Sequence, residues 1–311
     1  MSAILKYIAT TADDGKTVET ICKKEFNISS GLLTFLKLNG KLRINGEICR
    51  SVDILSPSDV LTIDVSENEA SSHIVSTKMD IDIVYEDDYI LIVNKPRNLC
   101  VHPSMKNFDN TLANGVMYYL RAKGENYNFH AVNRIDKNTS GLCIIAKNRF
   151  AHGILSEQIK AGVFERKYMA IIKGCPPAKS GTIDKPIRRE KESIIKRIVA
   201  PDGQRAITHY TVLKTNEKYS LVDIVLETGR THQIRVHFAD IGYPLVGDWL
   251  YGSEDKEHFS GHLLHAYFAK FLHPVTKETI KISLPLPFDM AYNSIFCGTD
   301  FSLKSQREIE L

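Results

Sequence analysis

An uninterrupted run of small and apolar residues, GLCIIA at 141–146, lies near the middle of the chain. A short run of this kind, without a polar position, predicts a strand that is buried on both faces. Charged, hydroxyl and turn-forming residues dominate positions 134–140 directly before it. A polar loop held by a buried strand is a common place for a functional site, and Asp136 is the carboxylate in this loop.

The apolar patterns after position 80 predict a large domain that contains both strands and helices. The segment 226–238 begins in a turn and continues as a helix, with Ile234 and Phe238 on one face. The remaining predicted elements are strands at 81–88, 89–94, 164–174 and 219–225, and helices at 111–123 and 151–161.

A smaller unit is predicted nearer the N-terminus, at about 16–65. Its patterns indicate helices at 18–22 and 32–36, a strand entering an Asn-Gly turn at 40–47, and an alternating strand at 59–65. Ser29 and Ser30 are suitable N-cap residues for the second helix.

The domain boundaries follow from these patterns and from the length of the chain. At 311 residues the chain can hold one large domain and one small one. Positions 67–79 are polar and lack periodicity, so they predict a linker. The predicted domains are therefore 1–66 and 80–311.

The composition is typical of a soluble globular protein, with 43% hydrophobic and 25% charged residues. No run approaches the ~20 apolar residues that a membrane span needs, and the N-terminus lacks the features of a signal peptide. Six cysteines are scattered without paired spacing, so neither a disulfide framework nor a zinc site is indicated. We expect a cytoplasmic protein that holds no metal.

The net charge of +3 is weak support for a polyanionic partner. The distribution says more, because Lys185 to Arg205 holds seven cations and three acids. Two interpretations stay open for this segment: a solvated hairpin, or an arm that follows a phosphate backbone.

Two local patterns have ordinary explanations. An aspartate before a strand most often hydrogen-bonds its own backbone in a turn, which is the simplest interpretation of Asp136. The spacing of His232 and His237 would suit a metal, but no third ligand of suitable spacing lies nearby. The sequence also contains no glycine-rich phosphate-binding motif for a nucleotide cofactor.

The segment NRIDKNTSG at 133–141 resembles the catalytic loop of the RluA/RluD family of RNA pseudouridine synthases. The family pattern is His-Arg-Leu-Asp, two variable residues and Thr-Ser-Gly, so Asn133 and Ile135 are departures. Asn98 stands where the family usually has glycine, and asparagine is the best substitute if that position needs a positive φ. Further segments that resemble the family are VYEDD at 84–88, IVNKP at 92–96, VHPS at 101–104, KYMAIIKG at 167–174, GRTHQIRVH at 229–237 and GYPLVGD at 242–248.

The N-terminal unit is similar to the ribosomal-protein-S-four-type RNA-binding module. That module presents basic residues from its second helix and the loop after it, where this chain has Lys37, Lys41 and Arg43. The alternative is a small structural appendage, because acids outnumber cations over residues 1–70.

The resemblance implies an α+β fold: a mixed, largely antiparallel central sheet with flanking helices, preceded by a small α/β RNA-binding domain. It implies that Asp136 acts as base or nucleophile on a flipped-out uridine. Arg235 would pair with that carboxylate, Tyr168 would stack on the base, and Arg134 would fill or brace the space that the base leaves.

Arg230 and His232 are implied to be structural or to face the RNA. The implied partner is structured RNA, with ribosomal RNA favoured over transfer RNA. The reaction needs no cofactor or metal, and we expect a monomer.

Two other functions are alternatives. A non-catalytic RNA-binding or ribosome-assembly factor would keep this fold, but binding alone requires neither Asp136 nor Arg235. A nucleoside hydrolase would share the cleavage of a C–N bond, but it would need water in the site and would release free uracil.

Overall fold

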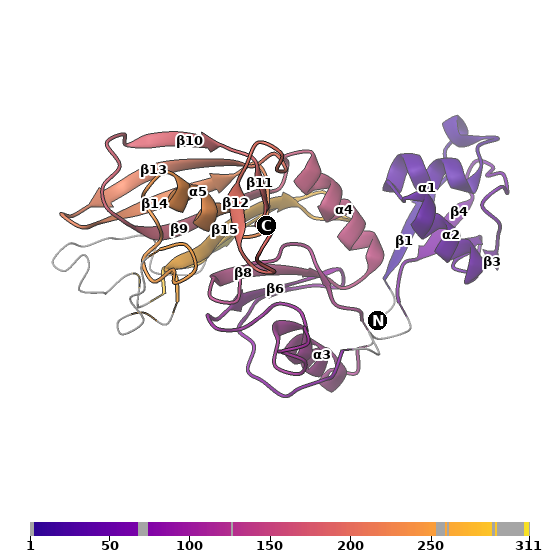
Figure 1. The fold of residues 1–311 in the computed structure, drawn as a ribbon. Helices are drawn as coiled ribbons and strands as arrows, with labels where there is room; N and C mark the ends of the chain where they lie inside the picture. Colours follow the sequence, from indigo (N-terminus) through magenta and orange to yellow (C-terminus); the bar gives the residue numbers. More distant parts are fainter. Residues whose placement is uncertain are drawn as a thin grey trace.

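The computed structural model describes residues 3–67, 74–125, 127–252, 259, 261–287, 290 and 308–310. A small N-terminal unit lies at one end of the molecule, and a large sheet domain makes up the rest (Figure 1). Within the described ranges, no helix has the length and apolar character to cross a membrane.

The N-terminal unit combines a small sheet with two helices. The Ser29 side chain accepts a hydrogen bond from the Leu32 amide, which confirms a predicted N-cap. Asn45 and Gly46 both have positive φ, as the predicted Asn-Gly turn requires. Its elements are β1 (Ile4–Ile8), a 3-10 helix (Thr11–Asp13), α1 (Val18–Phe26), α2 (Ser30–Leu38), β2 (Leu42–Ile44), β3 (Glu47–Ile48) and β4 (Val60–Asp64). The four strands form an antiparallel sheet in the order β1-β4-β2-β3.

The large domain is built on an 11-stranded sheet. Its strands are β5 (Ile83–Glu86), β6 (Ile90–Lys95), β7 (His130–Ala131), β8 (Ser140–Ala146), β9 (Glu165–Lys173), β10 (Ser180–Asp184), β13 (Ile207–Thr215), β14 (Tyr219–Leu226), β15 (Leu264–Leu272), β16 (Thr279–Ser283) and β17 (Glu308–Glu310). The order is β10-β13-β14-β9-β15-β8-β6-β5, with β16, β17 and β7 attached beside this path. The pairing is antiparallel except between β15 and β8, which confirms the predicted α+β class with a mixed, largely antiparallel sheet.

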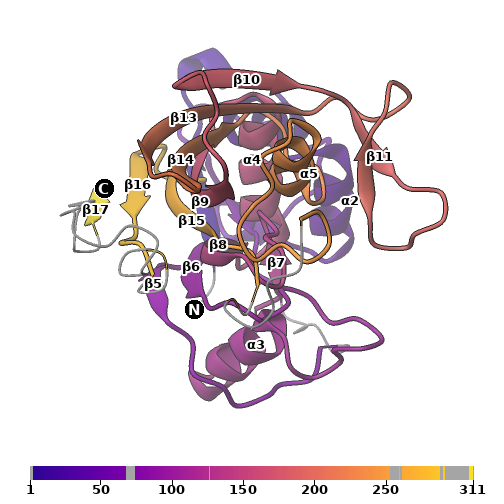
Figure 2. The same cartoon turned by 60° about the vertical axis from the view of Figure 1, so that its left-hand side comes forward.

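Helices cover both faces of this sheet. Residues of α3 (Leu112–Ala122) and α5 (Gln233–Asp240) share one apolar cluster with the strands. Leu155 of α4 (Arg149–Lys160) packs with the residues of the other face. A separate hairpin, β11 (Ile187–Arg189) with β12 (Arg197–Val199), stands out from the body of the domain (Figure 2).

The central strand β8 is buried on both faces, as its apolar run predicts. All seven of its residues are buried, and Cys143 and Ile145 point to one apolar cluster while Leu142 and Ile144 point to the other. Gly141 has φ +107°, and a Cβ there would lie 2.2 Å from the Ala266 carbonyl oxygen. Only glycine therefore permits the close parallel pairing of β8 with β15.

The N-terminal unit packs against α4. Phe150 and Ile154 of that helix belong to the same buried cluster as Leu33 and Leu36 of the N-terminal unit. The guanidinium of Arg149 also lies over the Phe35 ring, 4.9 Å from its centre. The two units therefore share apolar contacts in addition to their covalent connection.

The described ends of the predicted linker 67–79 are packed on the large domain. Glu67 is buried, accepts a hydrogen bond from the Arg149 amide at 2.9 Å and lies 3.1 Å from His130 Nε2. Ile74 is buried in the cluster beside α3. Residues 68–73 lie outside the described residues. The polar pattern of this segment gave no sign that its ends are packed in this way.

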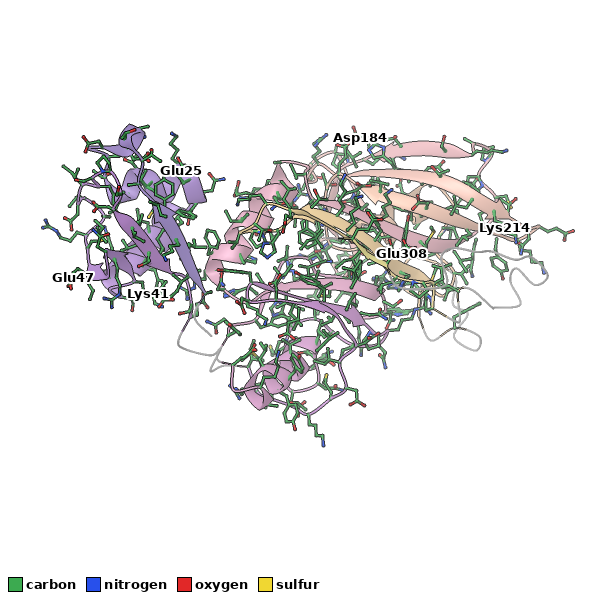
Figure 3. The ribbon with its side chains drawn as sticks, turned by 180° about the vertical axis from the view of Figure 1, so that it is seen from behind. Glu25, Lys41, Glu47, Asp184, Lys214 and Glu308 are labelled. Carbon is green, nitrogen blue, oxygen red and sulfur yellow. The ribbon has the colours of Figure 1, made fainter. Side chains whose placement is uncertain are left out.

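The tail at 288–311 is described at residue 290 and at 308–310 alone. The latter residues form β17, which pairs with β16 in register Lys281–Glu310 to Ser283–Glu308. Figure 3 labels Glu308 at this edge of the sheet.

Candidate active site

Asp136 lies in the loop that leads into β8. Its side chain contacts another segment of the chain, whereas the turn interpretation predicts a contact with its own backbone. The Thr139 amide donates to the Asp136 carbonyl oxygen at 3.1 Å, so a turn is present. The Asp136 carboxylate, however, accepts a hydrogen bond from Arg235 Nη1 at 2.9 Å. An aspartate that only closes a turn would direct this group at its own backbone.

The loop is held from two sides by buried polar groups. The Asn133 side chain donates to the Leu142 carbonyl at 3.0 Å and accepts from the Ile144 amide at 2.8 Å. Asn133, which replaces the family's histidine, therefore fixes the start of the loop to the backbone of β8.

Lys95 braces the other side of the loop. Its side chain is fully buried, and Nζ donates to the carbonyls of Pro96, Leu99 and Lys137 at 2.8, 2.8 and 3.1 Å. Asn98 in the same turn has φ +60°, so a positive φ is indeed adopted where the family has glycine. Lys137 follows Asp136 directly, so the Lys95 ammonium group helps to fix the position of the Asp136 carboxylate.

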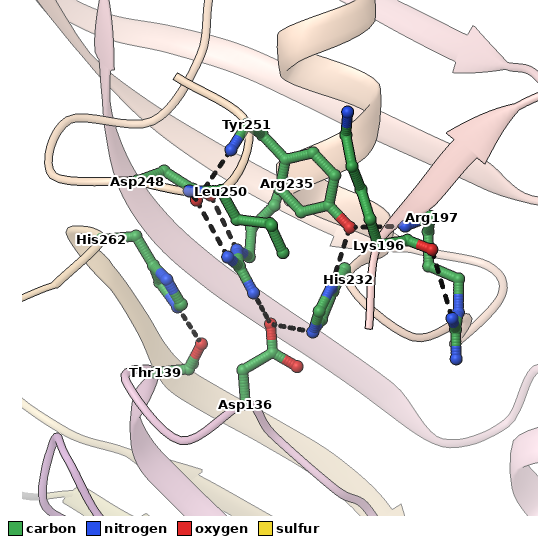
Figure 4. Close-up of polar contacts among 10 residues, drawn as sticks. All are labelled: Asp136, Thr139, Lys196, Arg197, His232, Arg235, Asp248, Leu250, Tyr251 and His262. Carbon is green, nitrogen blue, oxygen red and sulfur yellow. Dashed lines mark hydrogen bonds and ion pairs between the residues drawn. The ribbon is translucent and has the colours of Figure 1, made fainter. Parts of the chain in front are cut away.

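Arg235 is held between two carboxylates (Figure 4). Its Nε and Nη2 donate to both oxygens of Asp248 at 2.7 and 2.9 Å, which leaves Nη1 for Asp136. Arg235 is 5% exposed and Asp248 is 1% exposed. Asp248 also accepts from the amides of Leu250 and Tyr251. This two-point contact fixes the guanidinium plane, so its third nitrogen has a defined direction.

Tyr251 connects this ion pair to the β11–β12 hairpin. Its ring lies 5.0 Å from the Arg235 guanidinium, and its hydroxyl accepts from the Arg197 amide at 2.9 Å. The same hydroxyl lies 2.8 Å from His232 Nδ1, and His232 Nε2 lies 3.9 Å from the Asp136 carboxylate. His232 is the N-cap residue of α5 and has φ +59°. The Tyr251 and His232 side chains thus lie between the hairpin and the loop that carries Asp136.

The charges of the site are set by burial and by the Arg235 contacts. Burial raises the pKa of Asp248, but the hydrogen bonds from Arg235 outweigh it and hold that pKa below the usual range. Burial lowers the pKa of Arg235, yet the carboxylates of Asp248 and Asp136 raise it overall. Burial also lowers the pKa of His232, and that of His262 to about 3, so both histidines are neutral at pH 7.

A cleft of about 800 Å³ opens above Asp136. Tyr168 on β9 forms part of its wall, is 6% exposed, and has its pKa raised by burial. Arg134 and Arg230 are exposed at the cleft, and Arg230 Nε donates to the Arg205 carbonyl at 3.0 Å. Six predicted site residues therefore line one cleft, namely Asp136, Arg235, Tyr168, Arg134, Arg230 and His232.

The three basic residues predicted in the N-terminal unit behave differently. Lys37 and Arg43 are exposed and lie outside the cleft. Lys41 is 8% exposed, and its Nζ donates to the Ser66 carbonyl at 2.6 Å and to Asp64 at 3.1 Å. The prediction that Lys41 faces RNA is therefore wrong, because its ammonium group is used inside the unit.

The basic segment 185–205 does form a hairpin, but many of its cations are already paired. Ion pairs join Lys185 to Asp240 at 2.6 Å and Arg188 to Asp202 at 2.8 Å. Lys196 and Arg205 also have carboxylate partners, at 3.6 and 3.3 Å. Exposed pairs of this kind contribute little to stability and can be exchanged for phosphate contacts.

The two histidines with metal-like spacing do not face each other. Both nitrogens of His237 are used, by the Thr208 hydroxyl and the Lys185 carbonyl at 2.9 Å each. Among the residues that the structure describes, no group of three or more His, Cys, Asp or Glu side chains could hold a metal ion.

Sequence reasoning missed Asp248, Tyr251 and Arg166 as parts of the site. Asp248 did stand in a segment that matched the family pattern, and this was the available signal. Arg166 lies two positions before Tyr168 on β9 and lines the cleft, but an arginine in an alternating strand gives no sign of this. Their roles depend on contacts between distant segments, which spacing does not reveal.

Comparisons with known proteins show the family of this chain. The family model described as RNA pseudouridylate synthase matches residues 89–240. A Bacillus subtilis protein named "Uncharacterized RNA pseudouridine synthase YjbO" is 40% identical over 268 residues, which covers 86% of this chain and 94% of the relative. The "Ribosomal large subunit pseudouridine synthase D" of Pseudomonas aeruginosa is 36% identical over 267 residues, which covers 82% and 83% of the two chains.

The fold is also similar to a solved structure. "Human RNA Pseudouridylate Synthase Domain Containing 1" superposes with a TM-score of 0.57 and 26% identity, and the match covers 67% of this chain and 84% of that one.

Proposed function

Since this chain belongs to the RNA pseudouridylate synthase family and is an RNA-modifying isomerase, we propose that it converts a specific uridine of ribosomal RNA to pseudouridine, with Asp136 as the reacting group. The choice of ribosomal RNA is supported by relatives that are named as synthases of the large ribosomal subunit. The observation that carries the residue assignment is the Asp136–Arg235 contact of 2.9 Å at the floor of the cleft.

The reaction rearranges bonds within one nucleotide. The bond between ribose C1′ and uracil N1 breaks, the uracil turns, and C1′ bonds to C5. The hydrogen at C5 is released and N1 takes up a proton, so no oxidant, reductant or second substrate is consumed. The protein must supply a carboxylate beside the sugar and base, a pocket for a base that has left its stack, and protection from water.

The residues of the cleft suit these requirements. Asp136 acts as base or nucleophile toward the nucleotide, and its side chain is 22% exposed, so substrate can reach it. Arg235 keeps a cation beside this carboxylate after bound RNA has excluded water. Tyr168 presents a buried ring at the wall of the cleft, where it stacks on the uracil. Arg134 at the mouth fills the space left in the RNA.

The N-terminal unit is proposed to bind the same RNA outside the cleft. Lys37 and Arg43 are exposed on a unit that packs against α4, so both regions would contact one RNA molecule at a fixed relative orientation. These contacts add affinity and help to select the target.

Pseudouridine mapping in total RNA from cells with and without the gene tests this function. We expect at least one site in ribosomal RNA to disappear without the gene and to return when the wild-type chain is supplied. Asp136→Asn removes the carboxylate at nearly constant volume, so it should fail to restore that site while binding RNA almost as well. Asp109→Asn, at an exposed aspartate, is the matched control and should restore it.

Each outcome tests a different part of the proposal. Restoration of the site by Asp136→Asn would refute the role of that residue. Loss of a site in transfer RNA alone would refute ribosomal RNA as the substrate.

A further inference from the structure

Arg166 is a buried cation without a partner at the edge of the catalytic cleft. It lies on β9, is 9% exposed, and lines the same cleft as Asp136 and Tyr168. Its Nε is inaccessible and has no hydrogen-bond partner. Within the described ranges, the Arg166 side chain makes no hydrogen bond or ion pair. Among the described residues, the protein therefore supplies no anion to this guanidinium, and its Nε is shielded from water without a partner.

A buried arginine without an anionic partner lowers the stability of the folded protein unless a ligand supplies that partner. An arginine stays charged at any pH that the protein tolerates, so it cannot escape burial by losing its proton. Burial of an unpaired charge lowers stability, so such a group in a native structure needs an explanation, and a ligand that supplies the partner is one. Arg235 in the same cleft has two carboxylate partners, whereas no described carboxylate forms an ion pair with Arg166.

The surroundings of Arg166 leave its guanidinium open to the cleft. Residues two apart on a strand share a face, so Arg166 and Tyr168 both point to the cleft side of β9. A Cβ at Gly229 would lie 3.2 Å from Arg166 Nη1, closer than most side chains approach one another. The missing side chain at this position therefore keeps the end of the guanidinium uncovered. The cleft as a whole has a surplus of cations, because two carboxylates line it, those of Asp136 and Glu227, against six cationic side chains, those of Arg134, Lys160, Arg166, Arg205, Arg230 and Arg235.

We propose that Arg166 binds a phosphate group of the RNA strand that carries the target uridine. The planar guanidinium matches two phosphate oxygens, and each nucleotide brings one negative charge into the cleft. An uncharged uracil oxygen would leave the buried cation without an anion until the glycosidic bond breaks, so phosphate is favoured. This inference rests on the proposed function, since it needs an RNA strand in the cleft.

The first test compares variants of the full-length chain. Affinity is measured in an Asp136→Asn background, so no turnover occurs, with a ribosomal RNA transcript that contains the mapped uridine. Arg166→Gln should weaken binding on the order of tenfold to a hundredfold and lower the dependence of log affinity on log salt by about one. With Asp136 intact, the loss should appear mainly as a higher KM for RNA and much less as a lower kcat. Arg166→Lys should keep the salt dependence and be intermediate in affinity.

Lys167→Gln is the matched control. It removes a cation from the same strand, but Lys167 lies outside the cleft, where it pairs with Glu165 at 3.1 Å. This variant should change neither affinity nor salt dependence appreciably. The unfolding temperature of Arg166→Gln should be at least as high as that of the parent chain, because the variant removes a buried charge that has no partner.

The second test locates the phosphate. Short RNAs that span the target uridine carry an uncharged methylphosphonate at one linkage at a time. At one linkage near the target, the methylphosphonate should lower the affinity of the parent chain. The same RNA should bind Arg166→Gln as well as unmodified RNA does, because the contact is already lost in that variant.

The possible results separate this inference from the proposed function. If Arg166→Gln slows turnover at saturating RNA without changing affinity or salt dependence, Arg166 contacts the uracil and the phosphate assignment is wrong. If it only lowers thermal stability, the residue is structural. If the parent enzyme forms no pseudouridine in this transcript, the proposed function fails instead.

Discussion

The charged residues of the cleft around Asp136 and those of the N-terminal unit are organised differently. In the cleft, Asp136 and Arg235 come from segments 99 positions apart, and Arg235 and Asp248 are almost fully buried. In the N-terminal unit, most ion pairs are local and exposed, such as Lys23 with Glu19 and Arg50 with Asp53. Charges buried between distant segments have fixed directions, whereas exposed local pairs can exchange partners. The first arrangement suits bond rearrangement at one atom, and the second suits contact with an RNA surface.

Removal of Arg235 should produce the largest change on the cleft side of this comparison. Arg235→Leu leaves Asp248 buried without a partner, and loss of one member of a buried pair typically costs ~3–5 kcal/mol in the free energy of unfolding. Activity should collapse as well, because Asp136 loses its cation. Arg235→Lys keeps the charge but lacks the planar fork that spans both carboxylates, so it should be intermediate in both respects. Urea unfolding and single-turnover formation of pseudouridine measure the two effects.

Arg230→Leu gives the control for that experiment. Arg230 lies on the same segment but is exposed, so its loss should weaken RNA binding with little change in unfolding. If Arg235→Leu is as active as the wild-type chain, the ion pair is not part of the catalytic machinery.

Asp248→Asn should lower activity less than Arg235→Leu, because it changes only the position of the Arg235 guanidinium. The variant keeps the volume of the side chain but loses the two-point ionic contact that orients Arg235. A misplaced guanidinium should slow turnover on the order of a hundredfold, since small errors in position are costly in a reacting site. RNA affinity should be unchanged, because Asp248 is buried away from the RNA.

A double variant distinguishes positioning from a general loss of stability. If Asp248 acts through Arg235, its substitution should matter much less in an Arg235→Lys background than in the wild-type chain. Additive losses in turnover would contradict this role.

Sequence patterns predicted burial and backbone conformation correctly where these depend on the residue type itself. The apolar run at 141–146 requires burial on both faces, and β8 has it. Asn98 replaces a glycine of the family and adopts the positive φ that asparagine tolerates best. The Asp136–Arg235 contact was also predicted, but from resemblance to a family rather than from spacing.

Sequence patterns did not predict which residues of one type are buried or paired and which are exposed or unpaired. Lys41 and Lys37 are both lysines near the end of α2, yet Lys41 is buried against Ser66 and Asp64 while Lys37 is exposed. Likewise, Arg166 and Arg235 are both buried in one cleft, and among the described residues carboxylate partners are found for Arg235 but not for Arg166. Burial and pairing of a cation depend on segments that are distant in the sequence, so composition and periodicity cannot assign them.

The smallest predicted effect tests the N-terminal side of the comparison. Lys37→Gln with Arg43→Gln removes two exposed cations, so RNA affinity should fall a few-fold and the salt dependence should drop by about two. Turnover at saturating RNA should not change, because every residue of the cleft is intact. Lys41→Gln removes a cation of the same region that is buried, so it should lower the unfolding temperature of the chain without changing the salt dependence. If Lys41→Gln lowers the salt dependence and the Lys37–Arg43 double variant does not, the N-terminal unit presents a different surface to RNA.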